Sequence, residues 1–228
     1  MKKKSYILSL FLLVLAITFT ILVAKVDVRP VGPINPETGV TSEVGFATIN
    51  SAIAKRFEYN SVCYNISKYV GFLAFAFIAF YGIIGLIELI KKKSFKDINK
   101  VLYALVVFYV CIAIIYALFE VLTINYRPIL MDNELEASYP SSHTLLAICV
   151  CGSSLIVSHH LIKKEKLRII LNVVATIMMI LIIVTRFLSG VHWFTDIIGA
   201  IIISAFMLQS FSNTINYLTK NGEKEIEE

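Results

Sequence analysis

Residues 169–196 read IILNVVATIMMILIIVTRFLSGVHWFTD. The first part is an apolar run close to the roughly 20 residues that an α-helix needs to cross a bilayer. The run ends in Thr185 and Arg186, and His192 and Asp196 follow shortly after. Ionisable side chains at membrane depth are costly and are typical of functional sites. The segment therefore predicts a membrane-spanning helix that delivers polar residues to one membrane surface.

The whole chain is apolar in the same way. It has 228 residues, of which 57% are hydrophobic, and a soluble domain of this length rarely carries so much apolar material. We expect an all-α, polytopic membrane helix bundle that forms a single membrane domain over residues 1–228. Six transmembrane helices are expected, over residues 5–24, 69–90, 101–123, 143–162, 169–186 and 192–218.

The net charge of +5 comes from basic clusters that lie beside the apolar runs. These clusters are 2–4, 91–100 and 163–168. Basic loops flanking membrane spans are typical of the cytoplasmic side, so no nucleic-acid partner is expected. Alternating the six spans places the three clusters and both termini in the cytoplasm. The sequence thus predicts a multi-pass protein of the cell membrane whose active site lies on the extracytoplasmic face.

The chain divides into four segments. Residues 1–24 are expected to form the first transmembrane helix or an uncleaved signal anchor, with a cleaved signal peptide as the alternative. Residues 25–68 are expected to lie on the outer face with a short interfacial helix, which Ser42 would cap at its N-terminus. This helix would either cover the site or simply pack on the bundle. Residues 69–218 form the core of five spans, and 219–228 a cytoplasmic tail.

Two more polar groups lie where apolar spans begin or end, and they fall on the same face as the first. They are Tyr126-Arg127-Pro128 and Tyr139-Pro140-Ser141-Ser142-His143. A single arginine near a helix end could only snorkel to the headgroups, and a single histidine could be a core residue. Two arginines, two histidines and an aspartate on one face favour one shared site.

The residue types in these groups suit phosphate chemistry. Ser141 is a natural N-cap, and the free N–H groups of the helix that begins there attract anions. Arg127 and Arg186 carry planar guanidinium groups that match phosphate oxygens. His192 and Asp196 stand four residues apart on one helix face. The carboxylate can hold the imidazole in one tautomer and leave the other nitrogen free for nucleophilic attack.

Order and spacing resemble the three motifs of the type 2 phosphatidic acid phosphatase superfamily, which also includes the vanadium haloperoxidases. The family pattern is Lys, six residues, Arg-Pro; then Pro-Ser-Gly-His; then Ser-Arg, five residues, His, three residues, Asp. The matching residues here are Glu120 with Arg127-Pro128, then Pro140-Ser141-Ser142-His143, then Thr185-Arg186, His192 and Asp196. The resemblance covers roughly residues 69–218.

The resemblance implies a metal-independent phosphoric ester or anhydride hydrolase that acts on membrane lipids without a cofactor. His192 would be the nucleophile and form a phosphohistidine, and Asp196 would orient it. His143 would protonate the leaving oxygen and then activate water. The substrate phosphate would be bound by Arg127, Arg186, Ser141 and Ser142.

The chain departs from the family pattern at three positions. Thr185 keeps the hydroxyl of the expected serine. Ser142 adds a side chain at the expected glycine. Glu120 replaces the lysine with a carboxylate that repels phosphate, so we expect Glu120 not to bind it. It could pair with an arginine, meet a cationic substrate group or face away.

The expected partners are the lipid bilayer and a membrane lipid phosphate. Candidate substrates are polyprenyl diphosphate, phosphatidic acid and phosphatidylglycerol phosphate. The alternative is a non-catalytic or weakly active protein of the same fold that binds or transports lipid. A haloperoxidase that uses vanadate in the same pocket is disfavoured by the fully membranous chain.

Four aromatic residues lie beside the motifs: Tyr126, Tyr139, Trp193 and Phe194. Aromatic rings near the ends of spans are typical of interfacial anchors, and lining a lipid entrance is the alternative. The acidic loop before Pro140 lacks a calcium-loop pattern and is expected to be solvated, so no metal site is predicted.

Overall fold

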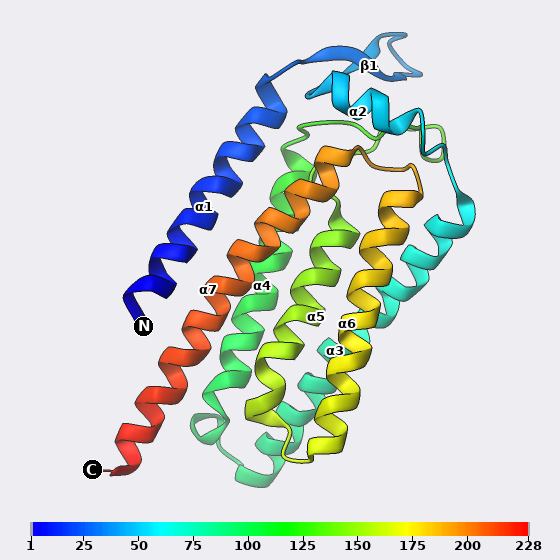
Figure 1. The fold of residues 1–228 in the computed structure, drawn as a ribbon. Coiled ribbons are helices and arrows are strands. Elements are labelled where there is room, and N and C mark those ends of the chain that lie inside the picture. The colour runs from blue at the N-terminus through cyan, green and yellow to red at the C-terminus, as the bar shows by residue number, and fades with distance from the viewer. Residues whose placement is uncertain (1, 228) are drawn as a thin grey trace.

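The computed structural model describes residues 2–227, with the side chains of residues 3–220. It contains seven α-helices and a small two-stranded sheet within that range (Figure 1). The elements in chain order are α1 (Lys2–Lys25), β1 (Arg29–Ile34), β2 (Thr41–Val44), α2 (Ala47–Ala54), α3 (Ser61–Lys92), α4 (Lys100–Val121), α5 (Ser142–Leu161), α6 (Glu165–Leu188) and α7 (Phe194–Glu227). A 3₁₀ turn over Phe95–Asp97 joins α3 to α4.

Six helices of the described chain, all except α2, are long and apolar enough to cross a membrane. They bear large apolar side chains on the outside, as lipid contact requires, for example Phe72, Val107 and Ile177. The predicted six-span helical bundle is therefore confirmed. The side of the membrane on which the termini lie stays a prediction.

The central helix of the bundle is α5, which packs against α3, α4, α6 and α7. Its middle carries small residues that let neighbouring helices approach closely. At Gly152, for example, an added Cβ would lie 2.5 Å from Cδ1 of Leu208 on α7. Because α5 is enclosed on these sides, its N-terminal end, with Ser141 to His143, is fixed within the bundle.

The first helix, α1, lies along α7 (Figure 1). Polar side chains join the two helices inside the apolar layer. Asn213 donates from Nδ2 to Oγ of Ser9 (2.9 Å) and accepts at Oδ1 from Oγ of Ser5 (2.5 Å). Hydrogen bonds between helices stabilise membrane bundles, so α1 is a packed member of this one.

The segment between α1 and α3 folds as a β1–β2 hairpin followed by α2, at one end of the bundle (Figure 1). The expected short helix is present, but it begins at Ala47, not near Ser42. Ser42 lies in β2 instead, and its hydroxyl donates to the carbonyl of Pro33 (2.9 Å). The next helix, α3, begins at Ser61, before the expected residue 69, with the Asn60 side chain as its N-cap.

The segment between α1 and α3 is tied to the first turn of α7. The Asn50 side chain of α2 is buried. It donates to Oγ1 of Thr195 (2.9 Å) and accepts a hydrogen bond from the backbone N–H of Thr195 (3.2 Å). The backbone N–H of Asn60 donates to the carbonyl of Ser189 (3.0 Å). Gly190 has φ +69°, and an added Cβ would lie 2.7 Å from the Phe57 carbonyl oxygen. Such a turn requires glycine, and it sets the position of His192.

Candidate functional site

The third motif brings His192 and Asp196 together in the turn before α7 and in its first turn. Both side chains are buried, and Nδ1 of His192 lies 3.5 Å from Oδ2 of Asp196. That distance is too long for a good hydrogen bond. The backbone N–H of Trp193 donates to the same carboxylate oxygen (2.8 Å). The structure thus pairs the two residues as the spacing predicted, but without a direct bond.

A third residue, Ser138, lies between them, and the sequence reasoning missed it. Its Oγ lies 3.1 Å from Nδ1 of His192 and donates a short hydrogen bond to Oδ2 of Asp196. Ser138 is buried in the loop before α5. A signal was its position directly before Tyr139-Pro140, where it must enter the same region as the second motif.

The other ring nitrogen of His192, Nε2, is buried without a hydrogen-bond partner. Burial lowers the pKa of His192 well below its ordinary value, and the positive charges of Arg186 and Arg127 and the ring of His143 lower it further. The imidazole is therefore neutral at pH 7. Arg127, Arg186 and His143 therefore lie within electrostatic range of His192, as the prediction of one shared site requires.

Arg186 lies at the end of α6, and its side chain is buried. Its Nη1 donates to Oγ of Ser67 (3.4 Å), and its guanidinium lies 5.4 Å from the centre of the Tyr64 ring, a cation–π contact. The Nε atom has no protein partner. Both partners come from α3, so this helix positions the arginine.

Arg127 lies in the loop after α4 and is held by an ion pair with Glu136, whose Oε2 is 3.0 Å from Nη2. The backbone N–H of Arg127 also donates to the carbonyl of Glu136 (3.0 Å). Its Nε is buried without a partner. Each arginine is therefore held through its terminal nitrogens, while its Nε remains available.

The second motif forms the start of α5. Ser141 is the N-cap residue, as predicted, but its hydroxyl donates to Oγ1 of Thr144 (3.0 Å) and its backbone N–H donates to the Asp196 carbonyl (3.1 Å). Ser142 and His143 follow in the first turn. The His143 ring lies against α3, where an added Cβ at Gly71 would be 3.3 Å from Cδ2. Its Nδ1 has no partner.

One face of α3 therefore lines the site. Tyr64, Ser67, Lys68 and Gly71 recur at the three- and four-residue spacing of a single helix face. The first two contact Arg186 and the last contacts the His143 ring. The Lys68 ammonium acts electrostatically on His143, together with Arg186 and Arg127. The sequence reasoning missed this face because it began the span at residue 69.

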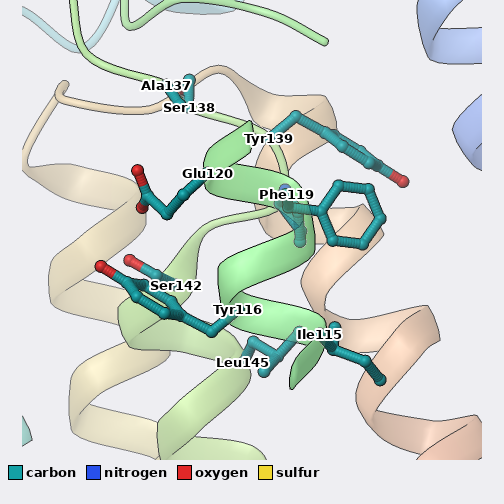
Figure 2. A pocket seen from close by; sticks show the side chains of 10 residues that line it. Ile115, Tyr116, Phe119, Glu120, Ala137, Ser138, Tyr139, Ser142 and Leu145 are labelled. Atoms are coloured by element: carbon teal, nitrogen blue, oxygen red, sulfur yellow. The ribbon is translucent and has the colours of Figure 1, made fainter. Parts of the chain in front are cut away.

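Glu120 lies near the end of α4 and lines a small pocket with Tyr116, Ser138 and Ser142. Figure 2 shows the Glu120 carboxylate on the same side of α4 as the Tyr116 and Ser142 hydroxyls. The side chain is exposed, and within residues 3–220 it forms no ion pair with either arginine. The Thr185 hydroxyl donates to the Leu181 carbonyl of its own helix (2.6 Å), away from the motif residues.

Two of the expected interfacial aromatic residues are buried, so that prediction is wrong for them. Tyr139 is only 1% exposed, with its hydroxyl 2.9 Å from Oγ1 of Thr20 on α1. Trp193 is buried as well, and its indole N–H donates to the Tyr126 carbonyl (2.7 Å). Tyr139 and Trp193 therefore pack the motifs together.

No group of three potential metal-ligating side chains is found in the described part of the chain.

Comparison with known proteins supports the assignment made from the motifs. The PAP2 superfamily model matches residues 119–220, which contain all three polar groups. The fold is similar to the crystal structure of the first transmembrane PAP2 type phosphatidylglycerolphosphate phosphatase from Bacillus subtilis, with a TM-score of 0.53 and 19% identity over 75% of this chain and 86% of that chain. No curated protein matches the chain significantly. The family model therefore agrees with the resemblance over residues 119–220, and the structural match shows the same membrane fold.

The buried position of His192 predicts its protonation state. At pH 6.0, about three quarters of free histidine is protonated, whereas the lowered pKa of His192 keeps its ring neutral. In ¹⁵N-histidine NMR spectra of the protein in micelles, the resonances that disappear in His192→Asn should report a neutral ring at pH 6.0. Free histidine in the same buffer serves as the reference. A protonated His192 at that pH would contradict the geometry.

Proposed function

Because residues 119–220 match the PAP2 superfamily model, we propose that this multi-pass membrane protein is a lipid phosphate phosphatase or diphosphatase. It hydrolyses a phosphate ester or anhydride of a membrane lipid through a phosphohistidine intermediate, without a metal ion. The observation that carries the proposal is the free Nε2 of His192. This atom is buried and unpaired, and the ring lies within electrostatic range of His143 and two arginines.

In the first step, the lone pair on Nε2 of His192 attacks phosphorus, and the bond from phosphorus to the lipid oxygen breaks. A protonated His143 gives its proton to that leaving oxygen. The phosphoryl group is then attached to Nε2, while Nδ1 keeps its hydrogen. The positive charge that develops on the ring is stabilised from the Nδ1 side, where Asp196 lies 3.5 Å away.

In the second step, the now neutral His143 takes a proton from water, whose oxygen attacks phosphorus. The N–P bond breaks, its electron pair returns to Nε2 of His192, and inorganic phosphate leaves. His143 is protonated again and ready for another cycle. The bonds made and broken in the two steps involve only the substrate, water and the two histidines.

The phosphate oxygens are bound by cations from three segments of the chain. Arg127 and Arg186 offer their unpaired Nε groups, and the N-terminus of α5 at Ser141 and Ser142 adds its partial positive charge. Lys68 supplies the third cation, which in the family pattern comes from the position of Glu120. Fixed positive charges of this kind stabilise the oxygens during phosphoryl transfer.

A lipid substrate is supported by an apolar cavity between α3, α4 and α5 that ends at the site. Phe72, Phe75 and Ile112 line its wall, and Ser142 and His143 lie at its polar end. A lipid chain fits such walls, while its phosphate reaches the histidine. Polyprenyl diphosphate, phosphatidic acid and phosphatidylglycerol phosphate remain the candidate substrates.

We also infer that both termini lie in the cytoplasm and that the site faces the extracytoplasmic side. The C-terminus and the loops α3–α4 and α5–α6 lie at the end of the bundle opposite the hairpin (Figure 1). The lysines at 91–93 lie at the end of α3 and the start of the first of these loops, and those at 163–164 lie in the second. Positive charge of this kind favours the cytoplasmic side.

Phosphate release from a panel of these lipids, in detergent with EDTA, tests the reaction. Turnover should survive chelation. His192→Ala should lower kcat by about a thousandfold or more, because the nucleophile is lost. His143→Ala should lower it by about 10²- to 10⁴-fold. The matched control is His160→Ala at the far end of α5, which should keep wild-type turnover. Unchanged activity in His192→Ala would contradict the proposal.

The role of Lys68 is tested by inhibition with orthovanadate, an oxyanion that resembles phosphate. Lys68→Met should weaken inhibition about 2- to 5-fold, the loss expected for one partly exposed cation. Adding Glu120→Lys to Lys68→Met should restore it. Lys163→Met, in the α5–α6 loop, removes the same charge at the opposite end and should leave inhibition unchanged. Wild-type inhibition of Lys68→Met would show that Lys68 does not contact the phosphate.

A further inference from the structure

We propose that Ser138 is a positioning residue through which Asp196 acts on the nucleophile His192. The inference rests on the proposed function and deepens it. The four-residue spacing of His192 and Asp196 predicts that the carboxylate orients the ring by a direct contact. In the structure a hydroxyl lies between them, so the functional unit is a chain of three side chains, with Ser138 as its middle member.

The distances support a bridge. The 3.5 Å between Nδ1 of His192 and Oδ2 of Asp196 is too long for a good hydrogen bond, whereas Oγ of Ser138 is within hydrogen-bond distance of both atoms. A hydroxyl has one hydrogen to donate and lone pairs to accept. The carboxylate can only accept, so the Ser138 hydrogen goes to Asp196. The remaining lone pair of Oγ then accepts from the Nδ1–H group of His192.

This polarity fixes the tautomer of His192. With the hydrogen on Nδ1, the lone pair must be on Nε2, which is the atom without a protein partner. When Nε2 bonds to phosphorus, the ring becomes positively charged and the Nδ1–H group becomes a stronger donor. The hydroxyl passes the negative field of Asp196 to that group without transferring a proton. Ser138 therefore favours the attacking form and the charged intermediate.

The loop that carries Ser138 is held rigidly. The backbone N–H of Ser138 donates to the Asn125 carbonyl (2.9 Å). The next residue, Tyr139, inserts its ring against α7, where a Cβ on Gly199 would lie 2.4 Å from the ring. The Tyr139 hydroxyl is 2.9 Å from Oγ1 of Thr20 on α1. Burial raises the pKa of Tyr139 to about 12, so the phenol keeps its hydrogen.

The kinetic test compares Ser138→Ala, Ser138→Cys and Ser138→Thr. Loss of the bridge should lower kcat about 10- to 100-fold, the effect of one buried hydrogen bond to a charged group, with little change in KM. The thiol of Ser138→Cys keeps most of the volume but bonds weakly, so it should resemble Ser138→Ala. Ser138→Thr keeps the hydroxyl and should recover most of kcat. The control Ser153→Ala, in the middle of α5, should have wild-type kcat. Wild-type kcat in both Ser138→Ala and Ser138→Cys would overturn the proposal.

A double-mutant cycle separates positioning from a purely structural role. If Ser138 acts through Asp196, then Ser138→Ala should cost little further activity in an Asp196→Asn background. If the loss of activity in the double variant instead equals the product of the two single losses, Ser138 does not act through Asp196 and the proposal is overturned.

NMR gives a readout that does not depend on turnover. The ¹⁵N spectrum of the wild type should show the hydrogen of His192 on Nδ1, and Ser138→Ala should redistribute it between the two nitrogens. An unchanged tautomer in Ser138→Ala would overturn the bridge even if no lipid is hydrolysed. Conversely, activity that survives in His192→Ala would refute the proposed function and leave the tautomer result standing.

Discussion

Burial of the Asp196 carboxylate is the constraint on which the site depends. A carboxylate removed from water must be compensated by hydrogen bonds or charges. Its donors come from two separate parts of the chain, the Ser138 hydroxyl before α5 and the Trp193 backbone N–H before α7. Its own carbonyl accepts from the backbone N–H of Ser141. The hydrogen bonds to Oδ2 and to the carbonyl of this one residue therefore join the second and third motifs and fix the start of α5 beside His192.

Packing of the helix bundle holds the segments around Asp196 in fixed positions. Small residues in α5 allow close helix packing, and α1 lies along α7 through hydrogen bonds with Asn213. The turn at Gly190 and the buried Asn50 of α2 hold the first turn of α7 at the end of the bundle that carries the hairpin. The apolar chain thus builds a membrane domain whose polar groups gather at one end, where a lipid phosphate can reach them.

The sequence was sufficient to predict the six spans and the shared face of the motifs, because both follow from local patterns of hydropathy and spacing. It did not reveal Ser138, since a lone serine in a loop acquires its role only when α7 packs beside it. The Tyr64–Gly71 face of α3 was missed because Lys68 interrupts the apolar pattern inside a helix. The β1–β2 hairpin was not predicted; β1 contains Pro30 and Pro33, which the edge positions of a two-stranded sheet tolerate.

The central claim is that phosphate is transferred through Nε2 of His192, and trapping that intermediate tests it most directly. Enzyme mixed with substrate can be quenched within milliseconds into alkali, where phosphohistidine survives, and its peptides analysed by mass spectrometry. The account predicts phosphate on the peptide that contains His192, at higher occupancy in His143→Ala, which slows hydrolysis of the intermediate. Phosphate on another residue, or turnover with no phosphorylated His192 at any time, would contradict it.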